Sequence, residues 1–284
     1  MSESSPPLPL VTPAERASFA EDGVVCLRGH FGDDWLVPLR EATDRVLAER
    51  KLTLDYTLAG APGRYVSGLF MWLSHPVFRD FALRSPAAAI AGELMGASRI
   101  HLFFDHLLIK EPGTPDPTHW HHDLPFWPVL GEQVCSLWLA LDHVTRDSGG
   151  VQFVAGSHRW PVRYRPIEPY TPELWRKRNM DLPECPSFFG EAGESGGGES
   201  GEHRILSWDL EPGDCVVFTA LTIHGSTGNA SSTERRRGFA TRWCGDGVTF
   251  IDDPHVLDLP WSPGLATGEP LGGALFPEVW RRGE

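Results

Sequence analysis

The pattern of the chain changes at Gly96, and this change constrains the fold more than any single motif does. After Gly96, short apolar runs are separated by turn segments such as Ser148-Gly149-Gly150. Short strands divided by glycine- and proline-containing turns are typical of a β-sandwich or β-barrel. The predicted strands are 100–110, 118–123, 134–142, 151–154, 205–208, 214–219 and 238–244. The chain is therefore predicted to be mainly β.

The start of the chain has helical signals instead. Thr12 and Glu15 have the spacing of a capping box, with Pro13 at the first helical position. A short helix is predicted to run to about residue 22 and to end at Gly23, before a strand over 24–27. These elements precede the β-rich part.

Two further helical segments follow. A helix is expected to begin near Asp34, because its apolar residues fall on one face. Residues 76–95 are predicted to form one or two helices, interrupted around Ser85-Pro86 and ended by Gly96. We expect these N-terminal helices to support the β-structure.

The expected domain organisation is simple. Residues 1–11 are predicted to be disordered, and 12–284 to form one domain with its β-core at about 100–245. Residues 186–202 are rich in glycine, glutamate and serine, and we expect a flexible surface loop there. Sequence leaves open whether this loop is a lid over a site or an insertion. The tail after Asp252 is expected to be mostly irregular.

Composition excludes several classes of protein. A formal net charge of −13 argues against nucleic acid or an anionic membrane as a partner. The chain contains no apolar run near the roughly 20 residues that a membrane-spanning helix needs. Its polar, proline-rich start lacks the features of a secretion signal. The 5 cysteines are scattered, as is typical of reduced thiols. We therefore expect a cytoplasmic protein.

One tripeptide indicates metal chemistry. His121 and Asp123 flank His122, so on an extended strand they would point to the same face. Together with His224 they would form a set of two histidines and one carboxylate, which holds non-haem Fe(II) and leaves coordination positions open. Two alternatives stay open at this point: a structural hydrogen-bonded pair, or a zinc or copper site that uses His119 with His121.

These residues lie within longer stretches that resemble a known family. The stretches are Lys110-Glu111-Pro112-Gly113, Thr118 to Trp127, Trp138-Leu139-Ala140-Leu141-Asp142, Gly149 to Arg159, and His224-Gly225-Ser226 with Asn229 and Arg235. Over roughly residues 15–245 the chain resembles the phytanoyl-CoA dioxygenase family of Fe(II)- and 2-oxoglutarate-dependent oxygenases. The resemblance implies a double-stranded β-helix, an eight-stranded jelly roll of the cupin type with N-terminal supporting helices.

The resemblance also implies roles for particular residues. His121, Asp123 and His224 match the iron ligands, and Arg235 matches the residue that binds the distal carboxylate of 2-oxoglutarate. Further cosubstrate contacts are implied at Ser226, Trp138 and His106, although histidine is not the residue expected at position 106. The implied cofactors are Fe(II), 2-oxoglutarate and O2. A carboxylate at position 123 favours oxygenation over halogenation, because halogenating relatives carry a small residue there.

A physical argument accompanies the resemblance. The planar fork of an arginine suits a carboxylate better than lysine does, which agrees with an arginine anchor at Arg235. Its neighbours Arg236 and Arg237 are expected to be surface charges, and Lys110 is expected to be a solvated residue at a strand end.

The sequence thus predicts a 2-oxoglutarate-dependent dioxygenase that hydroxylates a C–H bond of a small organic molecule, such as a secondary-metabolite intermediate, with release of succinate and CO2. Epimerisation, desaturation or oxidative ring closure with the same cofactors is the first alternative. The second is a cupin-like protein that binds a metal or ligand without turnover. The substrate and the oligomeric state cannot be deduced from the sequence.

Overall fold

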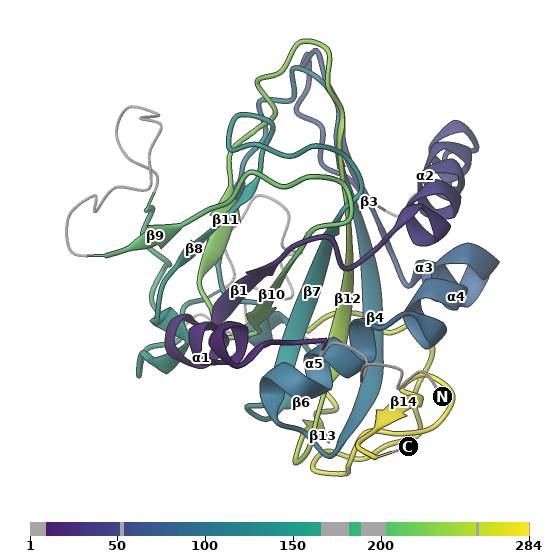
Figure 1. Ribbon diagram of the computed structural model, residues 1–284, viewed down its shortest axis with the longest axis vertical. Helices are drawn as coiled ribbons and strands as arrows, with labels where there is room; N and C mark the ends of the chain where they lie inside the picture. Colours follow the sequence, from purple (N-terminus) through teal and green to yellow (C-terminus); the bar gives the residue numbers. More distant parts are fainter. Residues whose placement is uncertain (1–9, 52–53, 166–181, 189–202, 254–255, 284) are drawn as a thin grey trace, which may run out of the picture.

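The computed structural model contains two facing β-sheets, with helices packed on the outer side of the larger one (Figure 1). It describes residues 10–51, 54–165, 182–188, 203–253 and 256–283. Consecutive strands in each sheet pair antiparallel. This arrangement agrees with the predicted jelly roll.

The larger sheet provides one wall of the jelly roll. Its strands, in spatial order, are β1 (Val24–Leu27), β10 (Cys215–Thr219), β7 (Val134–Ala140), β12 (Arg236–Cys244), β4 (Arg99–Lys110), β3 (Tyr65–Leu69) and β2 (Leu54–Asp55). The strand β14 (Glu278–Arg281) also pairs with β4. The long central strands β4 and β12 pair along nearly their whole length, so they form a rigid support for side chains on both faces.

The smaller sheet faces this wall. Its order is β5 (Thr118–His121), β11 (His224–Ser226), β8 (Val151–Val154) and β9 (Ile205–Leu206). Two short strands, β6 (Val129–Leu130) and β13 (Thr249–Phe250), pair separately. The 3₁₀ helices η1 (Leu124–Phe126) and η2 (Ser157–Arg159) follow β5 and β8.

The helices cover the outer face of the larger sheet. They are α1 (Pro13–Asp22), α2 (Asp33–Ala48), α3 (Met71–Ser74), α4 (Pro76–Arg84) and α5 (Ala87–Met95). Fully buried Phe78 and Phe81 pack against Phe239 of β12, with ring centroids 5.1 and 5.5 Å apart. Burying such a ring stabilises a fold by about 1.5–3 kcal/mol. The helices therefore fix the sheet that carries one side of the cavity described below.

Side chains alternate along β12. Phe239 and Trp243 belong to the core beneath the helices, whereas Ala240 belongs to the cluster between the two sheets. Because successive side chains on a strand point to opposite faces, the even-numbered residues of β12 face the interior of the jelly roll.

Most of the predicted elements are confirmed. The capping box of Thr12 and Glu15 is present, and Gly23 ends α1 in the left-handed conformation. The 76–95 segment forms two helices, α4 and α5, that are separated at Ser85-Pro86. The strands over 24–27 and 151–154 have the predicted bounds.

Several expectations about strand boundaries were wrong. The strand predicted over 118–123 ends at His121, because the chain turns there into η1. Strand β12 begins at residue 236 and not at 238, since Arg236 already pairs with Lys110. The tail after Asp252 is mostly irregular, as predicted, and it contributes the short strand β14, which extends the larger sheet.

Some expectations concern residues that the structure does not describe. Residues 1–9 of the predicted disordered N-terminus lie outside the described residues, and Val11 packs into the core. Most of the loop over 186–202, from 189 onward, also lies outside them. The single-domain organisation and the lid stay predictions. No helix among the described residues is long and apolar enough to cross a membrane.

Candidate active site

The two predicted histidine ligands come from adjacent strands of the smaller sheet. His224 at the start of β11 is paired with His121 at the end of β5. Their rings lie 4.3 Å apart between centroids. Residues more than 100 positions apart in sequence are thus brought side by side by one strand pairing.

Asp123 joins them through a turn and not through strand alternation. It has helical backbone angles, φ −74° and ψ −42°, and its carbonyl accepts a hydrogen bond from Phe126 N at 3.0 Å. The carboxylate Oδ1 lies 3.6 Å from His121 Nε2 and 3.8 Å from His224 Nε2. Two ligands of one metal lie about 2.1 Å from it, so both separations fit a shared ion. The predicted grouping is correct, but its strand geometry was not.

Backbone carbonyls fix the orientation of both imidazoles. His121 Nδ1 lies 2.7 Å from the carbonyl oxygen of His119, and His224 Nδ1 lies 2.9 Å from that of Thr222. A carbonyl can only accept, so each Nδ1 carries the proton and donates it. Each Nε2 therefore presents its lone pair toward Asp123, as a metal ligand must.

The charge state of the group also suits a cation. Burial would raise the pKa of Asp123, but His224, His121 and Arg242 hold it well below its usual range. Ser136 of β7 donates a hydrogen bond to Asp123 Oδ2 at 3.2 Å. Burial lowers the pKa of His224 to about 3. Asp123 is therefore ionised and His224 neutral near pH 7.

The structure gives no support for a metal site that uses His122. His122 Nδ1 lies 3.1 Å from the carbonyl of Leu221, and its Nε2 accepts a hydrogen bond from Tyr164 N at 2.9 Å. Both nitrogens of His122 are thus engaged with the backbone. Among the described residues, a clustering of possible metal ligands is found at His121, Asp123 and His224, where the ligand atoms all lie within 4.8 Å of one another.

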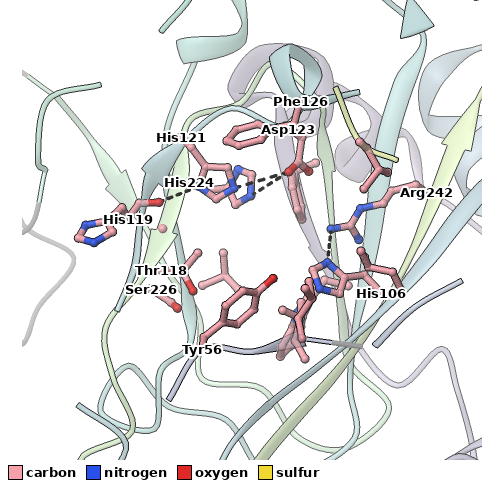
Figure 2. A pocket seen from close by; sticks show the side chains of 18 of the residues that line it. Tyr56, His106, Thr118, His119, His121, Asp123, Phe126, His224, Ser226 and Arg242 are labelled. Atoms are coloured by element: carbon pink, nitrogen blue, oxygen red, sulfur yellow. Dashed lines mark hydrogen bonds and ion pairs between the residues drawn. The ribbon is translucent and has the colours of Figure 1, made fainter. Parts of the chain in front are cut away.

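A cavity of about 230 Å³ opens beside these three residues, between the two sheets (Figure 2). The smaller sheet contributes Thr118, His119, His121, Val151, His224, Gly225 and Ser226. The larger sheet contributes Leu54, Tyr65, Leu69, Phe104, His106, Leu108, Trp138, Phe218, Arg236 and Arg242. Three of the predicted cosubstrate contacts, His106, Trp138 and Ser226, therefore line this cavity.

Arg235 does not line this cavity. Its guanidinium lies outside the jelly roll, where it donates to Glu111 at 2.9 Å and to Asp44 at 2.8 Å. Arg237 occupies the same outer face and forms an ion pair with Asp142 at 2.7 Å. Arg236, between them, points the opposite way, into the cavity. The residue expected to be a surface charge is thus buried, and the predicted anchor is on the surface.

The guanidinium of Arg236 is prepared for an anion. Arg236 is 2% exposed, and its Cζ lies 5.8 Å from the ring centroid of Trp138. Among the described residues its Nε has no hydrogen-bond partner, and Nη1 makes only a long contact of 3.5 Å with the carbonyl of Leu108. Burial lowers its pKa to about 10, so it keeps its charge at neutral pH.

Gly238 makes this arrangement possible. A β-carbon at position 238 would overlap the indole of Trp138, which lies directly over β12. The absence of a side chain therefore lets Trp138 pack across the strand, next to Arg236.

Lys110 is a second buried cation at this end of the cavity. It was expected to be solvated, but it is 0% exposed. Its Nζ donates to Ser226 Oγ at 3.0 Å and to the carbonyl of Thr227 at 2.6 Å. An ammonium group only donates, so the Ser226 oxygen accepts and its own proton is left for another acceptor. Burial, followed by the charge of Arg236, holds the pKa of Lys110 well below its usual range.

The comparison with known families identifies the chain. The phytanoyl-CoA dioxygenase (PhyH) model matches residues 19–238, which is most of the sequence. The chain belongs to the phytanoyl-CoA dioxygenase family. This confirms the predicted family and the predicted enzyme class, a 2-oxoglutarate-dependent non-haem iron dioxygenase.

Relatives of this phytanoyl-CoA dioxygenase family member include named dioxygenases. The multifunctional dioxygenase prhA of Penicillium brasilianum is 25% identical over 240 residues, which cover 79% of this chain and 69% of prhA. The dioxygenase aneA of Aspergillus aculeatus is 23% identical over 235 residues, which cover 78% of this chain and 68% of aneA.

Solved structures confirm the fold. The α-ketoglutarate-dependent epimerase SnoN from nogalamycin biosynthesis has a TM-score of 0.71 at 23% identity and covers 94% of this chain and 95% of its own. The carbocyclase SnoK from the same biosynthesis has a TM-score of 0.70 at 22% identity, with coverage of 95% and 97%. At this identity the likeness shows the jelly-roll fold.

The sequence missed Arg236, Arg242 and Lys110 as buried residues. For Arg236 the signal was the strand pattern itself. Gly238, Ala240 and Arg242 follow Arg236 at intervals of two, so all four residues lie on one face of the strand. The small residues Gly238 and Ala240 are typical of a face against which larger side chains pack.

Proposed function

We propose that the protein uses Fe(II), 2-oxoglutarate and O2 to hydroxylate a C–H bond of a small organic molecule. The observation that carries this proposal is the convergence of His121 Nε2, His224 Nε2 and the Asp123 carboxylate beside a cavity. This cavity also contains a buried arginine, Arg236, that has no acidic partner among the described residues.

The donor set suits iron. Two neutral imidazoles and one carboxylate on one side of a metal are the ligands of non-haem Fe(II) oxygenases. Each imidazole is oriented by a backbone carbonyl, and Asp123 is held by Ser136. In the proposal, His121, Asp123 and His224 hold the iron and leave its other side open toward the cavity.

The other polar groups of the cavity suit a dicarboxylate. Arg236 offers unpaired donors on a buried, charged fork. Ser226 lines the cavity beside it, with its hydroxyl oriented by Lys110. Arg236 and Lys110 repel one another, as the effect of Arg236 on the pKa of Lys110 shows. A carboxylate between them would relieve that repulsion, so we assign the distal carboxylate of 2-oxoglutarate to Arg236 and Ser226, in place of Arg235.

The chain supplies positioning and a water-poor enclosure. When bound, iron and 2-oxoglutarate supply the oxidising chemistry, with release of succinate and CO2. Trp138 and Arg236 would hold the cosubstrate at one end of the cavity, and His106 lies farther along β4, toward Arg242. Phe126 and Trp127 line the cavity near Asp123 and would exclude water from the reacting carbon.

Epimerisation or oxidative ring closure is a second candidate outcome. It is favoured by the likeness to SnoN, described as an epimerase, and to SnoK, described as a carbocyclase. Both come from the biosynthesis of a natural product, which supports a secondary-metabolite intermediate as the substrate class.

Two measurements test the proposal. Purified protein with Fe(II) should bind 2-oxoglutarate without oxygen, producing the visible absorption of their complex, and should release succinate when oxygen and a substrate are added. The product mass then separates the outcomes, since hydroxylation adds one oxygen atom, ring closure or desaturation removes two hydrogens, and epimerisation leaves the mass unchanged. If iron and 2-oxoglutarate do not bind together, the proposal is wrong; binding without succinate across a broad substrate panel would favour a non-catalytic binding protein.

A further inference from the structure

A second arginine faces the cavity with most of its hydrogen-bonding capacity unused. Arg242 follows Arg236 by six positions on β12, on the same inward face, and is 6% exposed. Its guanidinium stacks on Phe104 and Trp127, at 5.2 and 5.5 Å from the ring centroids. Its Nε and Nη1 are buried and have no hydrogen-bond partner in the part of the chain that the structure describes. A buried charged group in this state is unfavourable unless a ligand satisfies it.

His106 adds a second unused donor. Arg242 Nη2 lies 3.5 Å from His106 Nδ1, a long contact in which only the arginine can donate. The ring proton of His106 then resides on Nε2, which is buried and finds no partner among the residues described. Burial, with the charge of Arg242, lowers the pKa of His106 to about 3, so its ring is neutral. Arg242 and His106 therefore present donors to the same region of the cavity, and the combined charge is positive.

The acidic groups nearest to Arg242 are already committed. Asp105 lies on β4 beside His106, but its carboxylate accepts hydrogen bonds from Met71 N at 2.6 Å and Trp72 N at 2.7 Å at the start of α3, under the helices. Asp123 belongs to the proposed iron site. No described carboxylate lies within ion-pair distance of the Arg242 guanidinium.

A count of charges shows that the metal and cosubstrate do not require Arg242. Fe(II) and Asp123 together carry one positive charge, and the two carboxylates of 2-oxoglutarate change this to one negative charge. Arg236 restores neutrality even before Lys110 is counted. Arg242 is left as a positive charge on a different part of the wall, opposite Thr118, His119 and Ser226 (Figure 2).

We infer that Arg242 and His106 bind an anionic oxygen of the primary substrate, a carboxylate or an ionised enol or phenol, while Phe104, Trp127 and Leu257 contact its apolar body. This inference names the substrate class and rests on the proposed function. A molecule bound in this way lies next to Asp123, so a carbon near its acidic group faces the iron site.

The test compares two probes with the same apolar body and different charge. The probes are 2-naphthoate and the neutral 2-naphthamide, titrated by calorimetry into protein that holds Fe(II) and 2-oxoglutarate without oxygen. We expect wild type to bind the naphthoate roughly 10- to 100-fold more tightly, as hydrogen bonds to charged groups usually contribute. Absorption of the iron–cosubstrate complex is followed in the same samples, to show that the probe has not displaced 2-oxoglutarate.

Three variants assign the preference to one residue. In Arg242→Gln the naphthoate should lose its advantage, while 2-naphthamide and 2-oxoglutarate bind as in wild type. Arg242→Lys should keep part of the preference because it keeps the charge. Arg235→Gln is the matched control, since it removes an arginine from the outer face and should change none of the three affinities.

Three outcomes overturn the inference. Wild type without a preference for naphthoate, or Arg242→Gln with an intact preference, removes the anion subsite. A weaker 2-oxoglutarate complex in Arg242→Gln, with equal losses for both probes, makes Arg242 a positioning residue for the cosubstrate instead. Should Arg242→Gln fail to fold, the wild-type preference and Arg242→Lys decide. If wild type forms no iron–cosubstrate complex, the proposed function fails, and the same titrations on metal-free protein still test Arg242.

Discussion

Arginines on the two faces of β12 have opposite surroundings. On the outer side, Arg237 and the preceding Arg235 have permanent acidic partners, Asp142, Asp44 and Glu111. On the inner side, Arg236 and Arg242 are buried between the sheets and no described carboxylate pairs with them. The outer arginines are satisfied within the fold, whereas the inner ones require a ligand.

This difference distinguishes arginines that stabilise the fold from arginines that can bind a ligand. Exposed ion pairs usually contribute about 0–1 kcal/mol to stability. A buried unpaired guanidinium is instead destabilising until an anion arrives. The inner arginines of β12 therefore lower the stability of the unliganded protein and raise its affinity for an anionic ligand. Substitutions on the inner face should mainly change ligand binding, and substitutions on the outer face should mainly change stability.

The largest effect is expected from Asp123→Ala, because it removes a ligand of the proposed iron site. We expect iron binding and activity to fall by more than about 100-fold, since even residues that only support metal ligands usually contribute 10- to 100-fold. Metal content by atomic absorption and succinate release are the measurements.

Asp142→Ala is the control for that variant, since it removes an acid from the outer face of the larger sheet. Iron content should be unchanged there. Wild-type turnover in Asp123→Ala would show that the ligand set has been assigned incorrectly.

The second effect concerns the neighbouring arginines. Arg236→Gln should raise the 2-oxoglutarate KM on the order of 100-fold while iron still binds, because one buried charged fork is lost. Arg235→Gln should leave that KM within about twofold, since its partners Asp44 and Glu111 lie outside the cavity. The opposite ranking would return the anchor to Arg235 and would contradict the inward orientation of Arg236.

The sequence predicted the grouping of the three proposed iron ligands, but it did not predict that Arg236 and not Arg235 faces the cavity, for a physical reason. His121 and Asp123 are two positions apart, so a strand and a tight turn both bring them together. The anchor depends on where β12 begins after a loop, and a shift of one residue reverses the face of every side chain. A prediction from residues close in sequence can be correct even when the secondary structure is assigned wrongly. A prediction that depends on strand register cannot.

The burial of Lys110 and Arg242 was also not predicted from the sequence. Lys110 ends a strand next to Glu111, Pro112 and Gly113, which is the usual context of a solvated residue. It is buried because Tyr65 of β3 covers it, with the ring centroid 4.7 Å from Nζ. Strand β3 was not predicted, so nothing in the local pattern indicated this cover. Arg242 was missed for the same reason, since its neighbours Phe104 and Trp127 come from distant parts of the chain.

A third variant tests how the inner face of β12 is built. Gly238→Ala places a methyl group where the Trp138 indole lies, so Trp138 must move. We expect a loss of about 1–3 kcal/mol in the free energy of unfolding, as for other overpacked cores. The 2-oxoglutarate KM should rise as well, because Trp138 contacts Arg236.

Urea unfolding of Gly238→Ala is compared with that of Gly272→Ala. Position 272 has no atoms within 4 Å of an added β-carbon, so its variant should change stability by less than about 0.5 kcal/mol. Equal stability of the two variants would mean that Trp138 is not packed against β12 as described.

The smallest effect is expected on the outer face. Asp44 is 54% exposed and bridges Arg235 and Arg237 at 2.8 and 3.0 Å. Asp44→Ala should lower the free energy of unfolding by no more than about 1 kcal/mol, and this loss should shrink at high salt because screening weakens exposed pairs. Urea unfolding at low and high sodium chloride measures both. The KM for 2-oxoglutarate should not change, since Glu111 and Asp142 still hold the two arginines. A raised KM would show that charge on the outer face reaches the cavity, and the division of β12 into a structural and a functional side would then fail.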